Sequence, residues 1–179
     1  MLGPAPLVGQ PERAVAQTSV RSNSSPAAIP TTVPQTKGPD NSDLAILIVE
    51  DNLVNQKVLS KQLRKAGCTT YTADNGLLAL EVLATTLFQD QAGKPLSVIL
   101  MDLEMPEMDG LTAIGKIRDM EREGVLKGHV PVIAVTANVR DEQTKAAIGA
   151  GMDDVVSKPF RVPELLAKIR AVLARLGAA

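Results

Sequence analysis

Three acidic residues in this sequence directly follow apolar runs, and their types suit metal or phosphoryl chemistry. Asp102 follows residues 98–101, and Glu50 and Asp51 follow residues 46–49. Neighbouring carboxylates repel one another, and a divalent cation is the simplest way to neutralise them. A carboxylate can also attack phosphorus and form an acyl phosphate, provided that charge on the transferred group is neutralised.

Two further apolar runs end in side chains that would complement such a site. Residues 132–135 lead into Thr136, and the short run 155–156 leads to Lys158. An ammonium group can pair with one phosphoryl oxygen, and a hydroxyl group can donate a hydrogen bond to another. The carboxyl ends of the strands of an open parallel sheet lie on one edge, so we expect all these groups to converge there.

The elements that must position these groups alternate along the chain, as is typical of repeated strand–helix units. Strands are predicted at 45–49, 69–73, 98–102, 131–135 and 153–156. Five such units with right-handed crossovers predict a flavodoxin-like, doubly wound (βα)5 fold of the α/β class, with a five-stranded parallel sheet of order 2-1-3-4-5. That order puts the switch point between strands one and three, where Asp51 and Asp102 would meet.

The helices between these strands are predicted from apolar residues at helical spacing. The first would bury Val54, Val58, Leu59, Leu63 and Ala66, and the second Leu77, Leu80, Leu83, Ala84 and Leu87. Asp109 is expected to cap the third helix, and the last two are expected at about 141–150 and at 163–176.

Composition limits the class of protein. The chain has 179 residues, 45% of them hydrophobic, which is enough for one domain with a real core. Its formal net charge of -1 argues against nucleic acid or a membrane surface as a partner. The one cysteine, Cys68, permits no internal disulfide, and no secretory signal or run of membrane-spanning length is found. We therefore expect a cytoplasmic or nuclear protein.

Residues 1–43 differ in kind from the rest of the chain. Seven of the 12 prolines fall there, among Ser, Thr, Gln, Gly and Ala. Such a segment cannot bury enough apolar surface to offset its conformational entropy. We expect a disordered linker over 1–43, one domain over 44–176 and a short tail over 177–179.

Over residues 44–176 the sequence resembles the receiver domain of two-component response regulators. The matching segments are ILIVEDNLVNQ at 46–56, LMDLEMPEMDG at 100–110, VIAVTAN at 132–138 and SKPF at 157–160. The first and third segments are most similar to receivers at the carboxyl end of eukaryotic hybrid histidine kinases. The long linker and the end of the chain soon after the last helix fit that placement.

The resemblance implies a role for each candidate residue. Asp102 would be the phosphoacceptor, and Thr136 and Lys158 would contact the phosphoryl group. Mg²⁺ would be held by Glu50, Asp51, Asp102 and the backbone carbonyl of Glu104. The Lys158–Pro159 peptide bond would be cis, a state that is realistic only before proline.

The resemblance also implies a switch in a phosphorelay and not an enzyme in its own right. A histidine kinase or a histidine phosphotransfer protein would be the partner, docking on an apolar patch of Leu53, Val54, Pro159 and Phe160. Phosphorylation would move Thr136, Lys158 and the loop 137–140, and the output face would be the fourth helix, the fifth strand and the fifth helix. The sole histidine, His129, is predicted in a surface loop, so this chain would receive its phosphoryl group from elsewhere.

Two residues depart from the family pattern. Val155 stands where receivers commonly have an aromatic residue that reports the movement of the threonine, so an aromatic relay is not expected here. The side chain of Glu104 lies two residues after the phosphoacceptor, where it can affect the path of hydrolytic water and the lifetime of the phosphorylated state.

Three other functions are compatible with parts of the pattern. A flavodoxin-like electron carrier would share the fold, but Glu50 and Asp51 would repel the phosphate of its cofactor, and the only aromatic residues are one tyrosine and two phenylalanines. An aspartyl phosphatase of the haloacid dehalogenase type needs a second aspartate two residues after the first, where this chain has Glu104. A receiver-like scaffold that binds partners without phosphorylation remains open.

Overall fold

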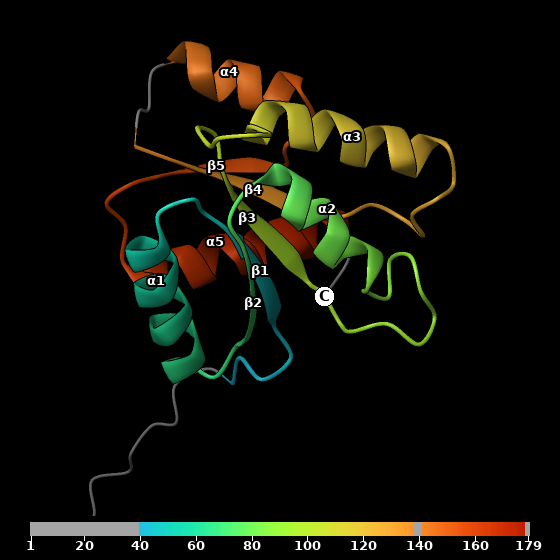
Figure 1. Cartoon of the computed structure of the whole chain (residues 1–179). Coiled ribbons are helices and arrows are strands. Elements are labelled where there is room, and N and C mark those ends of the chain that lie inside the picture. Colours follow the sequence, from blue (N-terminus) through green and yellow to red (C-terminus); the bar gives the residue numbers. More distant parts are fainter. Residues whose placement is uncertain (1–39, 138–140, 178–179) are drawn as a thin grey trace, which may run out of the picture. The chain divides into compact units, whose positions relative to one another are not determined.

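The computed structural model describes residues 40–137 and 141–177, which alternate strictly between strand and helix (Figure 1). The elements are β1 (Ala45–Val49), α1 (Leu53–Lys65), β2 (Thr69–Ala73), α2 (Gly76–Ala84), β3 (Val98–Asp102), α3 (Gly110–Arg122), β4 (Val132–Thr136), α4 (Asp141–Gly149), β5 (Asp154–Ser157) and α5 (Val162–Leu176). Each strand lies within one residue of its predicted position. The expected linker over 1–43 and the tail fall largely outside the described residues.

The strands form one parallel sheet of order β2-β1-β3-β4-β5, as predicted. The register pairs Val49 of β1 with Met101 of β3, Asp102 of β3 with Val135 of β4, and Thr136 of β4 with Ser157 of β5. The carboxyl ends of β1, β3, β4 and β5 therefore form one edge of the sheet.

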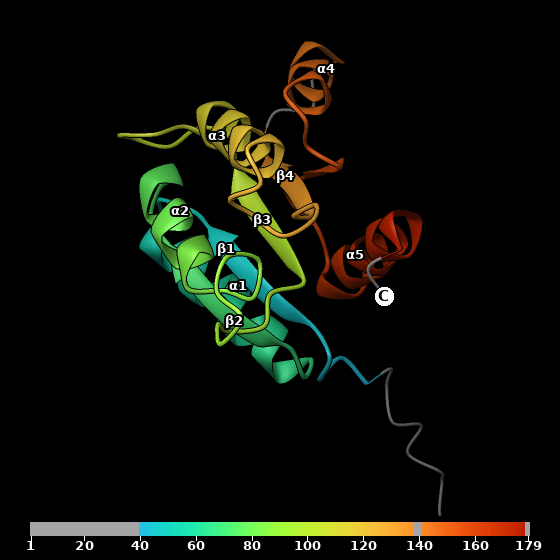
Figure 2. The same ribbon diagram turned by 90° about the vertical axis from the view of Figure 1, so that its right-hand side faces the viewer.

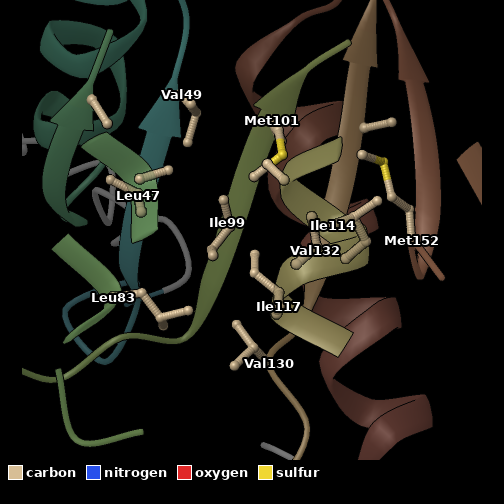
Figure 3. Close-up of a cluster of buried hydrophobic side chains, with 14 of the residues drawn as sticks. Leu47, Val49, Leu83, Ile99, Met101, Ile114, Ile117, Val130, Val132 and Met152 are labelled. Atoms are coloured by element: carbon tan, nitrogen blue, oxygen red, sulfur yellow. The ribbon is translucent and has the colours of Figure 1, made fainter. Parts of the chain in front are cut away.

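The sheet is covered by helices on both faces, which explains why its strands are almost continuously apolar. Alternate residues of β1, β3 and β4 pack on α2, α3 and α4 in one buried cluster. Figure 3 shows Val132 beside Ile114 and Ile117 in this cluster. The remaining strand residues pack on α1 and α5 in a second cluster. Figure 2 shows α3 on one side of β3 and β4 and α5 on the other.

Three helices begin at a polar residue whose side chain accepts hydrogen bonds from the first turn. Asn52 accepts from the backbone N–H groups of Val54 and Asn55, and Asn75 and Asp109 each accept one such bond. These contacts satisfy amide groups that have no partner within the helix. The predicted cap at Asp109 is confirmed, and the caps at Asn52 and Asn75 fix the starts of the two helices that follow β1 and β2.

The predicted second helix is too long. α2 ends at Ala84, because the hydroxyl groups of Thr85 and Thr86 donate to the carbonyls of Val82 and Leu83, and Thr86 then pairs with Lys94 in a β-bridge. Leu87 therefore lies beyond the helix and is exposed.

The predicted buried face of the first helix is also partly wrong. Val54 and Val58 are 69% and 50% exposed, whereas Gln56, Ser60 and Leu63 are the buried residues of α1. Hydrogen bonds of Gln56 to the end of β2, and of Ser60 to Thr70, hold this polar face inward. α1 therefore presents valines to the outside.

Among the described residues, no helix is both long and apolar enough to span a membrane.

His129 is exposed, as predicted, and its ring contacts two acidic side chains. It lies between the carboxylates of Asp153 and Glu121, with Nε2 2.7 Å from Asp153 Oδ1.

Candidate functional site

The three acidic residues predicted to converge do so at the carboxyl edge of the sheet. One ligand oxygen each of Glu50, Asp51 and Asp102 lies within 4.8 Å of the others. Glu50 is only 6% exposed, Asp51 is exposed and Asp102 is intermediate. β1 and β3 are neighbours in the sheet, so the strand order is what brings the carboxylates together.

Lys158 directly follows β5, which lies on the other side of β3 from β1, and its side chain reaches this acid cluster. Its Nζ lies 2.6 Å from Glu50 Oε2 and 2.6 Å from Asp102 Oδ2. Burial lowers the pKa of Lys158, but the hydrogen bonds to Asp102 and Glu50 outweigh burial, and the net pKa is raised above its usual value. The lysine therefore stays charged and offsets the repulsion between two carboxylates.

Thr136 is tied to the same edge through the backbone. It ends β4, is 3% exposed, and its carbonyl accepts a 2.8 Å hydrogen bond from the backbone N–H of Lys158. The Lys158–Pro159 peptide bond is cis, as the resemblance implied. The threonine ends β4 and the lysine directly follows β5, and both strands lie on the far side of β3 from β1. Residues 138–140 of the loop after Thr136 lie outside the described residues.

Two polar residues of α1 that the sequence analysis missed support the acid cluster. Asn55 Nδ2 donates to Glu50 Oε1 at 3.1 Å, so both oxygens of Glu50 are engaged. Gln56 Nε2 lies within hydrogen-bonding distance of the carbonyls of Glu50 and Ala73 and of the carboxylate of Asp74. The only sequence signal was the pair of amide residues that interrupts the apolar pattern of this helix.

The loop between β3 and α3 is held close to Asp102. The Glu104 backbone N–H lies 3.3 Å from Asp102 Oδ1, and the Glu104 carboxylate lies 3.4 Å from Gln143 Nε2 of α4. Farther along the loop, Asn75 Nδ2 donates to Glu107 Oε2 at 2.7 Å. These contacts anchor the segment whose backbone carbonyl at Glu104 is the predicted fourth ligand.

The donor set fits a hard divalent cation. Carboxylate oxygens are the preferred ligands of Mg²⁺ and Ca²⁺, and Mg²⁺ is commonly bound by one or two carboxylates with water and phosphate oxygens completing its shell. Asp51 is exposed and Asp102 is partly exposed, so both retain access to solvent and to an incoming group. The site can therefore hold a cation beside a partly exposed carboxylate and an ammonium group.

Comparison with known proteins identifies the family to which this chain belongs. The model of the family described as response regulator receiver domain matches residues 46–170, which is well over half of the chain. The chain is a response regulator receiver domain. This receiver belongs to two-component signalling, and the match spans β1 to α5, including every candidate site residue.

Relatives of this receiver include much longer signalling proteins. The hybrid signal transduction protein dokA of Dictyostelium discoideum is 40% identical over 120 residues, which are 67% of this chain and 6% of that protein. Histidine kinase 3 of Arabidopsis thaliana is 33% identical over an alignment of 159 positions, which covers 76% of this chain and 15% of that protein. The receiver therefore spans only a small part of these relatives.

Among solved structures, the receiver is similar to another receiver that was crystallised together with its partner protein. This is the co-crystal structure of the Saccharomyces cerevisiae histidine phosphotransfer protein Ypd1 with the receiver domain of its downstream response regulator Ssk1. The match has a TM-score of 0.61 and 31% identity, and covers 70% of this chain and 86% of that chain. The fold predicted from the sequence is thus that of known receivers.

Proposed function

We propose that this receiver accepts a phosphoryl group on Asp102 from a phosphohistidine and passes it on to a histidine phosphotransfer protein. The observation that carries this proposal is the position of Lys158, whose Nζ bridges Asp102 and Glu50 inside a cluster of three carboxylates. A lone aspartate at a strand end has many structural uses. An aspartate flanked by a metal-binding acid pair and a charged lysine has the parts that phosphoryl transfer needs.

The transfer is a displacement at phosphorus. An oxygen of Asp102 forms a bond to phosphorus while the phosphorus–nitrogen bond of the donor histidine breaks, and the imidazole leaves with the bonding electrons and takes up a proton. Lys158 exchanges a carboxylate contact for a phosphoryl oxygen, and the Thr136 hydroxyl donates to another. Onward transfer to a second histidine is the same step in reverse.

Glu50, Asp51, Asp102 and the backbone carbonyl of Glu104 are the residues that would hold Mg²⁺. When bound there, the cation supplies neutralisation of negative charge on the transferring phosphoryl oxygens. Glu50 is buried, whereas Asp51 is exposed and Asp102 is partly exposed, so Asp51 and Asp102 are the acids that an incoming cation can reach more easily.

The partner docks, in this proposal, on the apolar patch at the start of α1 and after β5. Leu53 and Val54 are 51% and 69% exposed, Pro159 is exposed and Phe160 is partly buried. Exposed apolar side chains grouped beside a reactive residue are typical of an interaction surface. The solved complex of a similar receiver with a histidine phosphotransfer protein supports the choice of partner.

After phosphorylation, the contacts of Thr136 and Lys158 favour a second conformation of the edge of the sheet, which α4, β5 and α5 communicate to an output partner. Val155, half-buried in the middle of β5, leaves this face without an aromatic relay.

A phosphotransfer assay tests the function. With Mg²⁺ and a labelled, phosphorylated histidine phosphotransfer protein, we expect label to appear on the wild-type receiver and on Asp119→Asn, a matched exposed aspartate of α3. Asp102→Asn is expected to take none. Val54→Lys is expected to slow transfer from the protein donor but not from a small phosphodonor, whereas Val125→Lys leaves both unchanged.

If the receiver binds the phosphotransfer protein but never takes up label or the phosphoryl mimic beryllofluoride, the proposed function is wrong. The chain would then be the phosphorylation-independent scaffold considered from the sequence.

A further inference from the structure

α1 and α5 cover the same face of the sheet (Figure 1). A groove lies between these two helices. It has two adjoining parts of about 610 and 560 Å³, which have Lys65, Ala66, Val162 and Pro163 in common. One part begins at Phe160 and the other ends at Asn41 and Arg170, at the end of α1 that is remote from Asp102. The groove therefore extends well beyond the docking patch described above.

The lining of the groove is apolar at its floor and basic at its sides. Its apolar lining, here called the floor, includes Ala66, Val162, Pro163 and Leu166. Lys65, Arg161 and Arg170 flank it, and among the described residues that line either part there is no aspartate or glutamate. An apolar floor between basic walls is suited to a segment that is apolar on one side and acidic at its edges.

The basic wall continues along α1 as a stripe of lysines. Lys57, Lys61 and Lys65 are spaced by four residues and are all exposed, and α1 contains no acidic residue. In the described part of the chain none of the three makes an ion pair, whereas Arg170 is held by Asp43. Like charges four residues apart destabilise a helix, so the three lysines lower the stability of α1. An acidic partner would neutralise their charges and remove this destabilisation.

We propose that the groove between α1 and α5 docks an acidic amphipathic helix of a partner protein. Its apolar side chains lie on the floor, and its acidic flanks meet Lys65 and the lysine stripe on one side and Arg161 on the other. Docking of a helix by its apolar face into a groove is a general mode of recognition. This surface goes beyond the proposed phosphoryl transfer, because none of its residues belongs to the acid cluster and its occupation requires no phosphoryl group.

The test is a titration of the full chain, labelled with ¹⁵N, with two designed helical peptides. Both carry leucines on one face, and they differ only in having glutamates or lysines on the flanks. We expect the acidic peptide to bind about tenfold more tightly or better, with chemical-shift changes confined to α1 and α5. Equal affinity for the two peptides, or shifts centred on another face, would overturn the proposal.

Matched variants give a second readout. Ala167→Gln places a longer, uncharged side chain in the groove at an exposed position of α5, and Lys65→Glu reverses one wall; both are expected to weaken binding of the acidic peptide. Lys116→Glu, on exposed α3 surface, is expected to leave it unchanged. Binding is expected to be the same in Asp102→Asn, so a loss of phosphoryl transfer and a loss of docking are distinguishable. If neither groove variant weakens binding, the groove is not the docking site.

Discussion

At the scale of single residues, Lys158 offsets the charge repulsion between carboxylates at the carboxyl edge of the sheet. Glu50 and Asp102 are largely buried, and Lys158 contacts both at 2.6 Å. Buried charges are tolerated only when they are paired and hydrogen-bonded, and removal of one partner leaves the others uncompensated. Lys158 is thus a structural residue as well as a candidate for contact with the phosphoryl group.

Replacement of Lys158 by methionine should lower the free energy of unfolding at pH 7 by about 1–3 kcal/mol, since two carboxylates lose a charged partner. The pKa of Lys158 is raised in the folded state, so its stabilisation is fully present below the ordinary lysine pKa of 10.5. It is lost as the pH rises through the higher folded value. Urea denaturation of both proteins checks this: the difference should persist at neutral pH and shrink above pH 10.5. Equal stability at pH 7 would contradict the prediction.

Asp51 is the residue whose loss should most directly reveal a bound cation. A ligand that binds only the folded state at 100 times its dissociation constant stabilises that state by about 2.7 kcal/mol. Magnesium should therefore raise the Tm of the wild type and of Asp119→Asn by several degrees, as measured by differential scanning calorimetry. In Asp51→Asn the rise should be much smaller. An equal rise in Asp51→Asn would exclude Asp51 as a ligand.

At the scale of elements, the strands were easier to predict than the faces of the helices. Parallel strands covered on both sides read as continuous apolar runs, so periodicity and the polar residues after them located β1, β3 and β4 closely. The inward face of α1 could not be predicted in this way. It is set by Gln56 and Ser60, whose partners lie on β2 and become visible only once the chain is folded.

The same reasoning explains which side chains of the candidate site could be predicted to converge. Asp102, Thr136 and Lys158 were predictable because each ends or follows a strand, and all parallel strands end on one edge. Asn55 and Gln56 were not, because their role depends on the distance from α1 to the end of β1. The role of a side chain that positions another residue through a tertiary contact is difficult to predict from a single sequence.

Gly110 links α3 to the site. A Cβ atom at this position would lie 2.3 Å from the carbonyl oxygen of Asp102, whereas one at Gly115 of the same helix would meet nothing within 4 Å. Gly110→Ala should therefore lower the free energy of unfolding by about 1–3 kcal/mol through overpacking. Gly115→Ala should raise it by up to about 1 kcal/mol, because alanine favours helix. Chemical denaturation of the two variants tests the pair, and a Gly110→Ala variant as stable as the wild type would rule out the close approach.

At the scale of the whole described domain, the two edges of the sheet have different polar clusters. At the amino edge, Asp153 accepts hydrogen bonds from Arg118 and from the backbone N–H of Val132, and His129 contacts it as well. These contacts join the end of α3 to the starts of β4 and β5. The carboxyl edge brings together Glu50 and Lys158, 108 positions apart in the sequence, and leaves Asp51 exposed. Ion pairs hold both edges, and at the carboxyl edge those of Lys158 lie beside the exposed carboxylate of Asp51.

The central claim is that Asp102 is the carboxylate that becomes phosphorylated. The most direct measurement is the intact mass of the chain after incubation with a small phosphodonor and Mg²⁺, which needs no protein partner. We predict that the wild type and Asp119→Asn each gain the mass of a single phosphoryl group, that a chelator prevents the gain, and that Asp102→Asn gains nothing. A phosphoryl group found on Asp102→Asn to the same extent as on the wild type would contradict the account.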